Sequence, residues 1–520
     1  MTLKSTDKSF DQHTFFKERS AGLLLHPTSF PGKYGIGDLG LELYKFVDFL
    51  SNHKLNLWQV LPLGPTGYAD SPYQSFSAFA GNPMLISLER LIEMNLLTSE
   101  ECEPTELFPD SFVDFGRVIE NKWDLLKIAF KRYQKNPPSI IKKELEQFAK
   151  VHFWWLEDYS VFMALKLDNE LKAWIEWDKD LRFYNPSVIE EWKKDHERRL
   201  LFQKFTQFLF FRQWKEAKEY TNRKGIRIIG DIPIFVAYDS VDVWSHPEYY
   251  KLDEERKLKY VAGVPPDYYS KTGQRWGNPL YNWDTLKKDG YEWWIQRIRH
   301  CFQIVDILRI DHFRGFESYW QIPASEETAV IGTWEPGPGI EIFHKLRQEL
   351  GDLAIIAEDL GFITPKVEKL LQETGYPGMK ILQFAFEEQR ANHAKNRFLP
   401  HNYDKNSIAY TGTHDNQTTK AWFNDRPKKV KNYIIDYCDS NGEDIVGDLI
   451  RLIWSSVASM AVIPLQDLLR LGDEARMNFP GTTSENWKWR FTWNQVNKKF
   501  CNTLTNMSEL YGRALYEDES

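Results

Sequence analysis

Residues 304–316 read Ile304-Val305-Asp306-Ile307-Leu308-Arg309-Ile310-Asp311-His312-Phe313-Arg314-Gly315-Phe316. The first five are mostly apolar and β-branched, which is typical of a short buried strand. Side chains alternate along a strand, so Leu308 and Ile310 share one face while Arg309 and Asp311 share the other. A guanidinium and a carboxylate on an otherwise buried strand indicate the open end of a barrel, where strand ends face a ligand.

The Arg309–Asp311 pair admits two interpretations. Arg309 should keep the neighbouring carboxylate ionised, and an ionised carboxylate held in a cleft can act as a nucleophile. The pair can instead be a structural ion pair at a strand end, since structural pairs also perturb titration.

Seven further short apolar stretches have the same character, and most are followed by a helical pattern. The eight predicted strands are Ala21–Leu25, Leu57–Leu61, Ile226–Asp231, 304–311, Ala354–Glu358, Met379–Phe384, Ser407–Thr411 and Met460–Pro464. Alternating strands and helices imply an α/β fold with a parallel sheet, and eight strands close naturally into a (β/α)8 TIM barrel. A doubly wound open sheet is the alternative, but no Gly-x-Gly-x-x-Gly turn follows the first strand.

Two segments interrupt the alternation of strands and helices in the barrel, which we expect to span residues 15–520. Residues 84–200 are charged and aromatic and predict a mostly helical insertion after the second strand. Residues 237–281 are rich in glycine, proline and aromatic residues and predict a loop-rich insertion at the active site. Single helical patterns cover 283–302 and 417–437. About 55 residues follow the eighth strand, too few for a β-sandwich domain of ~100 residues, so we expect none at the C-terminus.

Composition excludes several classes of function. The net charge of −8 argues against binding to a phosphate backbone, so no nucleic-acid partner is expected. Four scattered cysteines show no zinc-ligand spacing and suggest reduced thiols in the cytoplasm. The polar N-terminus lacks the apolar core of a secretory signal, and no stretch approaches the ~18 apolar residues of a membrane helix. We expect a cytoplasmic protein that does not bind membranes.

Acidic residues follow four of the predicted strands, and we expect them at one rim of the barrel. They are Asp231, Asp311, Glu358 and Asp415. Any one of them can simply cap the helix that follows its strand. Four together, with Arg309 and the histidines 312 and 414, are hard to explain by capping. Metal binding is a second alternative, because Mg²⁺ and Ca²⁺ prefer oxygen ligands.

Glycosyl transfer is a reaction that uses several carboxylates in one cleft. A retaining enzyme needs an ionised nucleophile and a protonated acid ~5–5.5 Å apart, and their surroundings must separate the two pKa values. Arg309 marks Asp311 as the ionised member. Glu358 follows an apolar run, which suits a pKa raised by desolvation.

Seven motifs stand in a fixed order between about Leu23 and Arg490. They are Asp70–Gln74, Gly263–Tyr268, Gln274–Pro279, Arg309–Gly315, Ala357–Gly361, Thr413–Asn416 and Ala475–Asn478. Together they resemble the 4-α-glucanotransferases, or amylomaltases, of glycoside hydrolase family 77. The resemblance implies the barrel fold and transfer of an α-1,4-glucan segment to a maltooligosaccharide or glucose acceptor by retaining double displacement, with no cofactor and no metal.

The resemblance also implies roles by position. Asp311 would be the nucleophile, Glu358 the general acid/base, and Asp415 the carboxylate that holds the sugar hydroxyls and stabilises the transition state. The residues implied around the reacting sugar are Tyr73, Asp231, Arg309, His312 and His414. The residues implied over the donor and acceptor chain are Asp267, Trp276 and Asn278. Asn478 would approach the site from the loop after the eighth strand. Tyr68 resembles a residue of a second, surface glucan site.

Two rival functions stay open at this point. An α-amylase-type hydrolase would share the barrel and the three acids, although it usually carries the β-sandwich that this chain lacks room for. A non-catalytic glucan-binding protein is disfavoured, because unused buried carboxylates cost stability. Transfer should depend on the second insertion, where Trp276, Tyr268 and Tyr269 could stack the acceptor and exclude water. Two departures from the family pattern, Gln417 for an expected Asp and Phe479 for a small residue, leave the three carboxylates intact.

Overall fold

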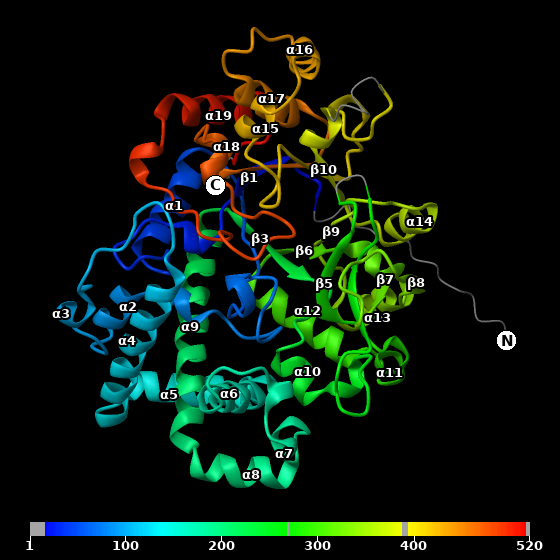
Figure 1. Ribbon diagram of the computed structural model, residues 1–520. Helices are drawn as coiled ribbons and strands as arrows, with labels where there is room; N and C mark the ends of the chain where they lie inside the picture. The colour runs from blue at the N-terminus through cyan, green and yellow to red at the C-terminus, as the bar shows by residue number, and fades with distance from the viewer. Residues whose placement is uncertain (1–15, 268–269, 387–393, 516–520) are drawn as a thin grey trace, which may run out of the picture.

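The barrel predicted from the sequence is present. The computed structural model describes residues 16–267, 270–386 and 394–515, and its eight barrel strands pair in parallel around a closed ring (Figure 1). In ring order the strands are β1 (Ser20–Leu24), β12 (Met460–Pro464), β11 (Ser407–Tyr410), β10 (Gly378–Ile381), β9 (Ile355–Ala357), β6 (Ile307–Asp311), β3 (Arg227–Pro233) and β2 (Leu57–Gln59). The fold class is therefore confirmed.

Alternation along each strand divides the core into two layers. Ile307 points into the barrel, where it packs with residues such as Ile229 and Ile356. Leu308 and Ile310 point outward and join the larger cluster beneath the helices. The predicted division of β6 into an apolar and a charged face is thus confirmed.

The predicted strand ends are less accurate than the strands. β2 ends at Gln59 and β9 ends at Ala357, so Glu358 lies one residue beyond its strand. The predicted end of the sixth strand is a 3₁₀ helix over Leu382–Phe386. These strands end earlier than predicted because the chain leaves the hydrogen-bonded sheet to enter the loops at the rim of the barrel.

Helices surround the barrel and fill the first insertion. The insertion and the long helix that returns from it comprise α2 (Leu88–Glu93), α3 (Ser99–Cys102), α4 (Phe115–Lys135), α5 (Ser139–Val151), α6 (Phe153–Asp168), α7 (Lys179–Arg182), α8 (Pro186–Asp195) and α9 (Glu197–Arg223). The other helices are α1 (Leu41–Asn52), α10 (Val241–Ser245), α11 (Trp283–Lys288), α12 (Glu292–Ile304), α13 (Ile340–Leu350), α14 (Pro365–Thr374), α15 (Thr419–Asn424), α16 (Lys428–Tyr437), α17 (Ile445–Ser455), α18 (Leu465–Leu468) and α19 (Lys498–Leu510). Helices α2–α8 gather at the lower left of Figure 1, away from α15–α17 at the top.

Two patterns that predict single helices are each interrupted. Between α11 and α12 the chain passes through Gly290 at φ 74° and Tyr291 at φ 61°, a left-handed conformation that ends a right-handed helix. Between α15 and α16 it passes through Pro427, the residue just before α16. Proline lacks the backbone N–H that a continuing helix needs.

A second, four-stranded antiparallel sheet lies beside the barrel and was not predicted. Its order is β5 (Gln274–Pro279), β4 (Tyr260–Val264), β7 (Ser318–Pro323) and β8 (Thr333–Pro336). The sheet joins the second insertion to the segment that follows β6, and it lies at the right of Figure 1. The insertion is therefore more regular than a loop-rich segment, because β4 pairs with β7 from outside the insertion.

Within the described residues, no helix has both the length and the apolar character needed to cross a membrane.

Candidate active site

Strand β6 brings Arg309 and Asp311 to the mouth of the barrel, as predicted. Arg309 is buried, and its Nη2 donates to Asp311 Oδ1 at 2.8 Å. Its Nη1 donates to Asp231 Oδ2 on the neighbouring β3 at 2.5 Å. One guanidinium therefore links the acids of two adjacent strands.

The surroundings of Asp311 shift its pKa in opposite directions. Burial raises the pKa of Asp311 to about 6, Arg309 opposes this rise, and the charges of Asp231 and Asp415 add to it. Arg309 therefore favours the ionised form of this carboxyl, as predicted, although desolvation outweighs the ion pair. The carboxyl is still mostly ionised at pH 7.

Glu358 lies between two backbone donors at the end of β9. Its Oε2 accepts from the His312 N–H at 2.8 Å, and its Oε1 accepts from the Leu360 N–H at 2.6 Å. Burial is the main cause that raises its pKa to about 8, and the charge of Asp311 raises it further. The predicted rise by desolvation is confirmed, and Glu358 is mostly protonated at pH 7.

Asp415 follows β11 after a turn of four residues rather than ending the strand. Its Oδ1 accepts from Asn478 Nδ2 at 2.6 Å, and its Oδ2 lies 3.3 Å from His414 Nε2. Burial alone would raise the pKa of Asp415, but His414 and Asn478 hold it well below the usual range. Asp415 is therefore the most firmly ionised of the three proposed catalytic acids.

Tyr73 connects the two sides of the rim from the loop after β2. Its hydroxyl donates to Asp231 Oδ2 at 2.7 Å and lies 2.9 Å from His414 Nε2. Its ring stacks on the His414 ring at a centroid distance of 5.3 Å. The side chain of Asp231 is fully buried, so in this structure it holds Tyr73 and Arg309 in place.

His312 adopts a left-handed backbone conformation directly after β6, with φ 53°. Burial and the charge of Arg314 lower its pKa to about 3, so the ring is neutral. Among the described residues its Nε2 has no hydrogen-bond partner. The His312 ring packs nearly perpendicular to the ring of Trp276 on β5, with the two centroids 4.7 Å apart, which ties the second sheet to the site.

The remaining predicted residues divide into buried and exposed groups. Asn278 is buried on β5, donates to the Val236 carbonyl at 2.8 Å and accepts from Gln74 Nε2 at 3.2 Å. Asp267, after β4, is exposed and accepts from the Ser270 N–H at 2.8 Å. Tyr68 is 74% exposed and does not join the buried group. Tyr268 and Tyr269 lie outside the described residues.

Two residues near the acids carried no role in the sequence analysis. Arg476 Nη2 donates to the Asp415 carbonyl at 3.0 Å, and its Nε donates to the Asn478 carbonyl at 2.8 Å. Its motif was recognised, but no pattern assigned the guanidinium a partner. The ring of Trp487 lies 5.7 Å from that of Tyr73 and 6.0 Å from that of His414. No local signal marks Trp487, because these contacts join loops far apart in the sequence.

The two departures from the family pattern have local partners. Gln417 Nε2 donates to Asp425 Oδ2 at 2.7 Å. Phe479 lies beneath the guanidinium of Arg476 at 4.4 Å. Phe479 therefore touches the residue that supports Asp415 and Asn478, whereas Gln417 bonds toward α15.

Metal chemistry receives no support from the described part of the chain. It contains no group of three or more His, Cys, Asp or Glu side chains arranged to hold a metal ion. The acids at the rim are instead paired with Arg309, backbone N–H groups and Asn478.

Comparisons with known proteins agree with this geometry. The family model described as 4-alpha-glucanotransferase, Glyco_hydro_77, matches residues 25–496. The chain is 48% identical to a 4-alpha-glucanotransferase of Synechocystis sp., with 96% of this chain and 99% of that protein covered. It is 47% identical to one of Thermus thermophilus, with 94% and 98% covered. Amylomaltase from Streptococcus agalactiae in complex with acarbose has a TM-score of 0.92 at 39% identity, covering 96% of this chain and 100% of that one.

These matches do not favour the α-amylase-type hydrolase. The family model and both relatives name glucan transfer, over nearly the whole chain. The chain therefore belongs to the 4-α-glucanotransferases of glycoside hydrolase family 77, the amylomaltases, enzymes that act on α-1,4-glucans.

Proposed function

We propose that Asp311 is the nucleophile and Glu358 the general acid/base of this glucan transfer. The observation that carries the proposal is that β6 places Asp311 beside the cation of Arg309, while two backbone N–H groups hold the Glu358 carboxyl just after the neighbouring strand β9. Burial raises the pKa of Asp311 to about 6 and that of Glu358 to about 8. Near pH 7 the first is mostly ionised and the second mostly protonated. A retaining double displacement begins from this arrangement.

The reaction then proceeds in two balanced steps. Asp311 attacks the anomeric carbon, the glycosidic bond breaks, and the Glu358 proton moves to the leaving 4-oxygen. The shortened chain departs and leaves a glycosyl ester on Asp311. Glu358, now a carboxylate, takes the proton from the 4-hydroxyl of an acceptor sugar, whose oxygen attacks the same carbon and releases Asp311.

The other residues would bind the sugars and hold the acids. Asp415, with its low pKa, would accept hydrogen bonds from sugar hydroxyls and stabilise positive charge in the transition state. The residues that would surround the reacting sugar are Tyr73, His312, His414 and Asn478, with Asp231 and Arg309 behind them. The residues that would cover the glucan chain are Asp267, Trp276 and Asn278. The exposed Tyr68 would belong to a second glucan site on the surface.

Further features complete the proposal. The barrel of residues 15–520 would carry two functional insertions, 84–200 and 237–281. The enzyme would work in the cytoplasm without nucleic-acid or membrane partners. Its four cysteines are all free, which suits a reducing compartment, and its net charge of −8 opposes binding to phosphate.

Trapping the glycosyl-enzyme tests the assignment of the nucleophile. A slow glycosyl donor should label the enzyme once, and mass spectrometry of its peptides should place the sugar on Asp311. The Asp311→Asn variant should remain unlabelled. Glu358→Gln keeps the nucleophile and serves as the matched control, because a glycosyl fluoride donor needs no acid for its leaving group and should still label it. Label on Glu358 or Asp415 would reverse the assignment, and no label in the wild-type enzyme would contradict double displacement.

A further inference from the structure

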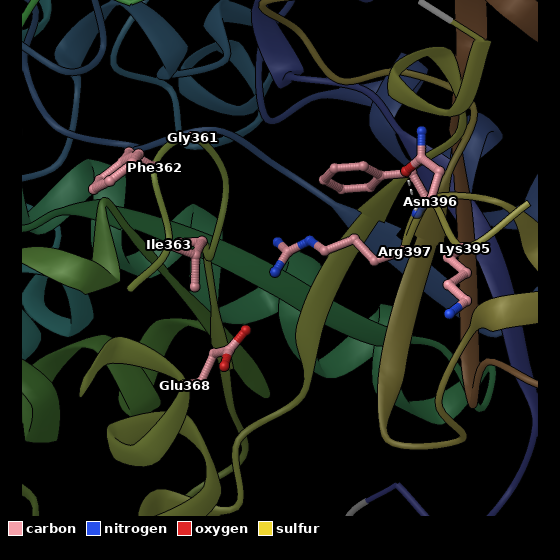
Figure 2. Close-up of a pocket in the computed structure, with 8 residues that line it drawn as sticks. Gly361, Phe362, Ile363, Glu368, Lys395, Asn396 and Arg397 are labelled. Carbon is pink, nitrogen blue, oxygen red and sulfur yellow. Dashed lines mark hydrogen bonds between the residues drawn. The ribbon is translucent and has the colours of Figure 1, made fainter. Parts of the chain in front are cut away.

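A pocket opens beside the end of β9 and is separate from the hydrogen-bonded group around Asp311. Its volume is about 500 Å³. Figure 2 shows Phe362 and Ile363 on one side and Glu368 below them. Arg397 reaches across from the opposite side and points its guanidinium toward the centre. The volume is within the range of small-molecule binding sites.

The pocket is held close to Glu358. Its first lining residue, Gly361, comes three residues after Glu358, so an extended chain of that length places it within about 10 Å. Arg397 Nη2 donates to the Asp359 carbonyl at 2.6 Å and to Asp359 Oδ2 at 3.1 Å. Asp359 Oδ1 accepts from the Met379 N–H of β10 at 2.7 Å. The two walls are therefore fixed to the strand that leads to Glu358 and to its neighbour.

The lining combines an apolar ring with charged groups. Phe362 is 70% exposed. A single exposed phenylalanine is ordinary on a protein surface, but this ring stands at the mouth of a pocket. The exposed carboxylate of Glu368 can accept hydrogen bonds, and the guanidinium of Arg397 can donate them. A sugar has a matching character, because its C–H face is apolar and its edge carries hydroxyls.

A second exposed ring continues this surface toward β8. Trp334 is 38% exposed and lies beneath the guanidinium of Arg314 at 3.9 Å. Arg314 Nη1 also donates to the Phe362 carbonyl at 2.5 Å. Arg314 follows His312 by two residues, so one side chain connects the loop after the nucleophile strand to both aromatic residues. The two rings are thus linked on one side of the site.

We propose that Phe362 and its pocket, with Trp334 beside it, form an acceptor subsite for distant sugars of a long α-1,4-glucan. The inference rests on the proposed role of Glu358. An acid/base residue touches the oxygen of the leaving and incoming sugars, so a pocket that begins just beyond it lies on the leaving-group side. Asp415, His414 and Asn478 meet on a different part of the rim. A short acceptor would end before the pocket, and a long one would reach it.

The test compares acceptors of two lengths in the Phe362→Ala variant. Maltose and maltoheptaose, each labelled at the reducing end, are mixed with excess amylose as donor, and only labelled products longer than the acceptor are counted. The ratio of the KM for maltoheptaose to that for maltose should rise about tenfold, which corresponds to ~1.4 kcal/mol. Phe362→Tyr keeps a ring and should restore most of the wild-type ratio.

Matched controls separate binding from folding. Leu107→Ala removes another exposed apolar side chain, on the first insertion, where Leu107 is 86% exposed, and should leave both KM values at wild-type levels. Arg397 and Trp334 are less suitable first targets, because they also support Asp359 and pack on Trp320. An unchanged ratio in Phe362→Ala, or an equal rise in both KM values, would overturn the subsite. Failure of the wild-type enzyme to extend either acceptor would instead overturn the proposed function.

Discussion

At the scale of single residues, the protonation state of Asp311 depends on opposing electrostatic effects, and one substitution can change it. Burial and the charges of Asp231 and Asp415 raise the pKa of Asp311 to about 6, and Arg309 pulls it down. Activity that needs ionised Asp311 and protonated Glu358 should rise with pH through about 6 and fall through about 8. A bell-shaped profile of kcat/KM would report these two values for the free enzyme.

Arg309→Met should move the acidic limb of that profile to higher pH. The variant removes the charge that favours the ionised form of Asp311, so more alkaline solution is needed to ionise it. It also leaves buried Asp231 without its cation, which costs about 3–5 kcal/mol of stability, so profiles should be taken well below the measured Tm. Arg309→Lys, which keeps the charge, should return the limb toward the wild-type position. A large loss of rate with an unmoved acidic limb would show that Arg309 positions the sugar instead.

The residues that could be predicted are those whose own strand identifies them. Arg309 and Asp311 alternate with Leu308 and Ile310 on one short strand, so their shared face followed from spacing alone. Glu358 directly follows an apolar run, which indicated its desolvation. The roles of Asp415 and Asn478 came only from the family resemblance, because their contact joins two loops. No local pattern encodes such a contact.

At the scale of elements, the barrel strands were predictable and the second sheet was not. Most barrel strands are short, largely apolar runs buried on both faces, which stand out from their surroundings. β8 is a mostly exposed edge strand of four residues, Thr333–Pro336, and lacks that signal. β4 and β5 are short and together hold Gly263, Gly277 and Pro279, and β4 also pairs with β7 from outside the insertion. Tertiary contacts define this sheet more than local preference does.

The second sheet matters because β5 places Trp276 against the His312 ring. Water at about 55 M competes with the acceptor for the glycosyl-enzyme, and orientation can offset this with effective molarities of ~10⁵ M. Trp276→Ala should therefore raise the ratio of hydrolysis to transfer several-fold, measured as new reducing ends per longer product. Trp276→Phe, which retains a ring, should stay near the wild-type ratio. Equal losses of hydrolysis and transfer in Trp276→Ala would show that the ring binds donor rather than acceptor.

At the scale of the whole molecule, the site is assembled from loops that leave one rim of the barrel. The loop after β2 supplies Tyr73, β6 supplies Asp311, the end of β9 supplies Glu358, and the loop after β11 supplies Asp415. The segment after β12 adds Asn478. Because parallel strands place all their C-terminal ends together, residues more than 400 positions apart meet at one rim of the barrel.

This assembly predicts how the intact enzyme should treat maltotriose as its sole substrate. Transfer breaks one α-1,4 bond and makes another, so the number of reducing ends stays nearly constant, whereas hydrolysis adds one for each bond broken. We therefore expect free glucose together with a ladder of maltooligosaccharides longer than maltotriose, with little rise in total reducing ends. Chromatography of the products and a reducing-end assay on the same samples measure both quantities. Glu358→Gln, which has no carboxyl proton to donate, is the matched inactive control. A doubling of reducing ends without any product longer than maltotriose would show that water is the principal acceptor.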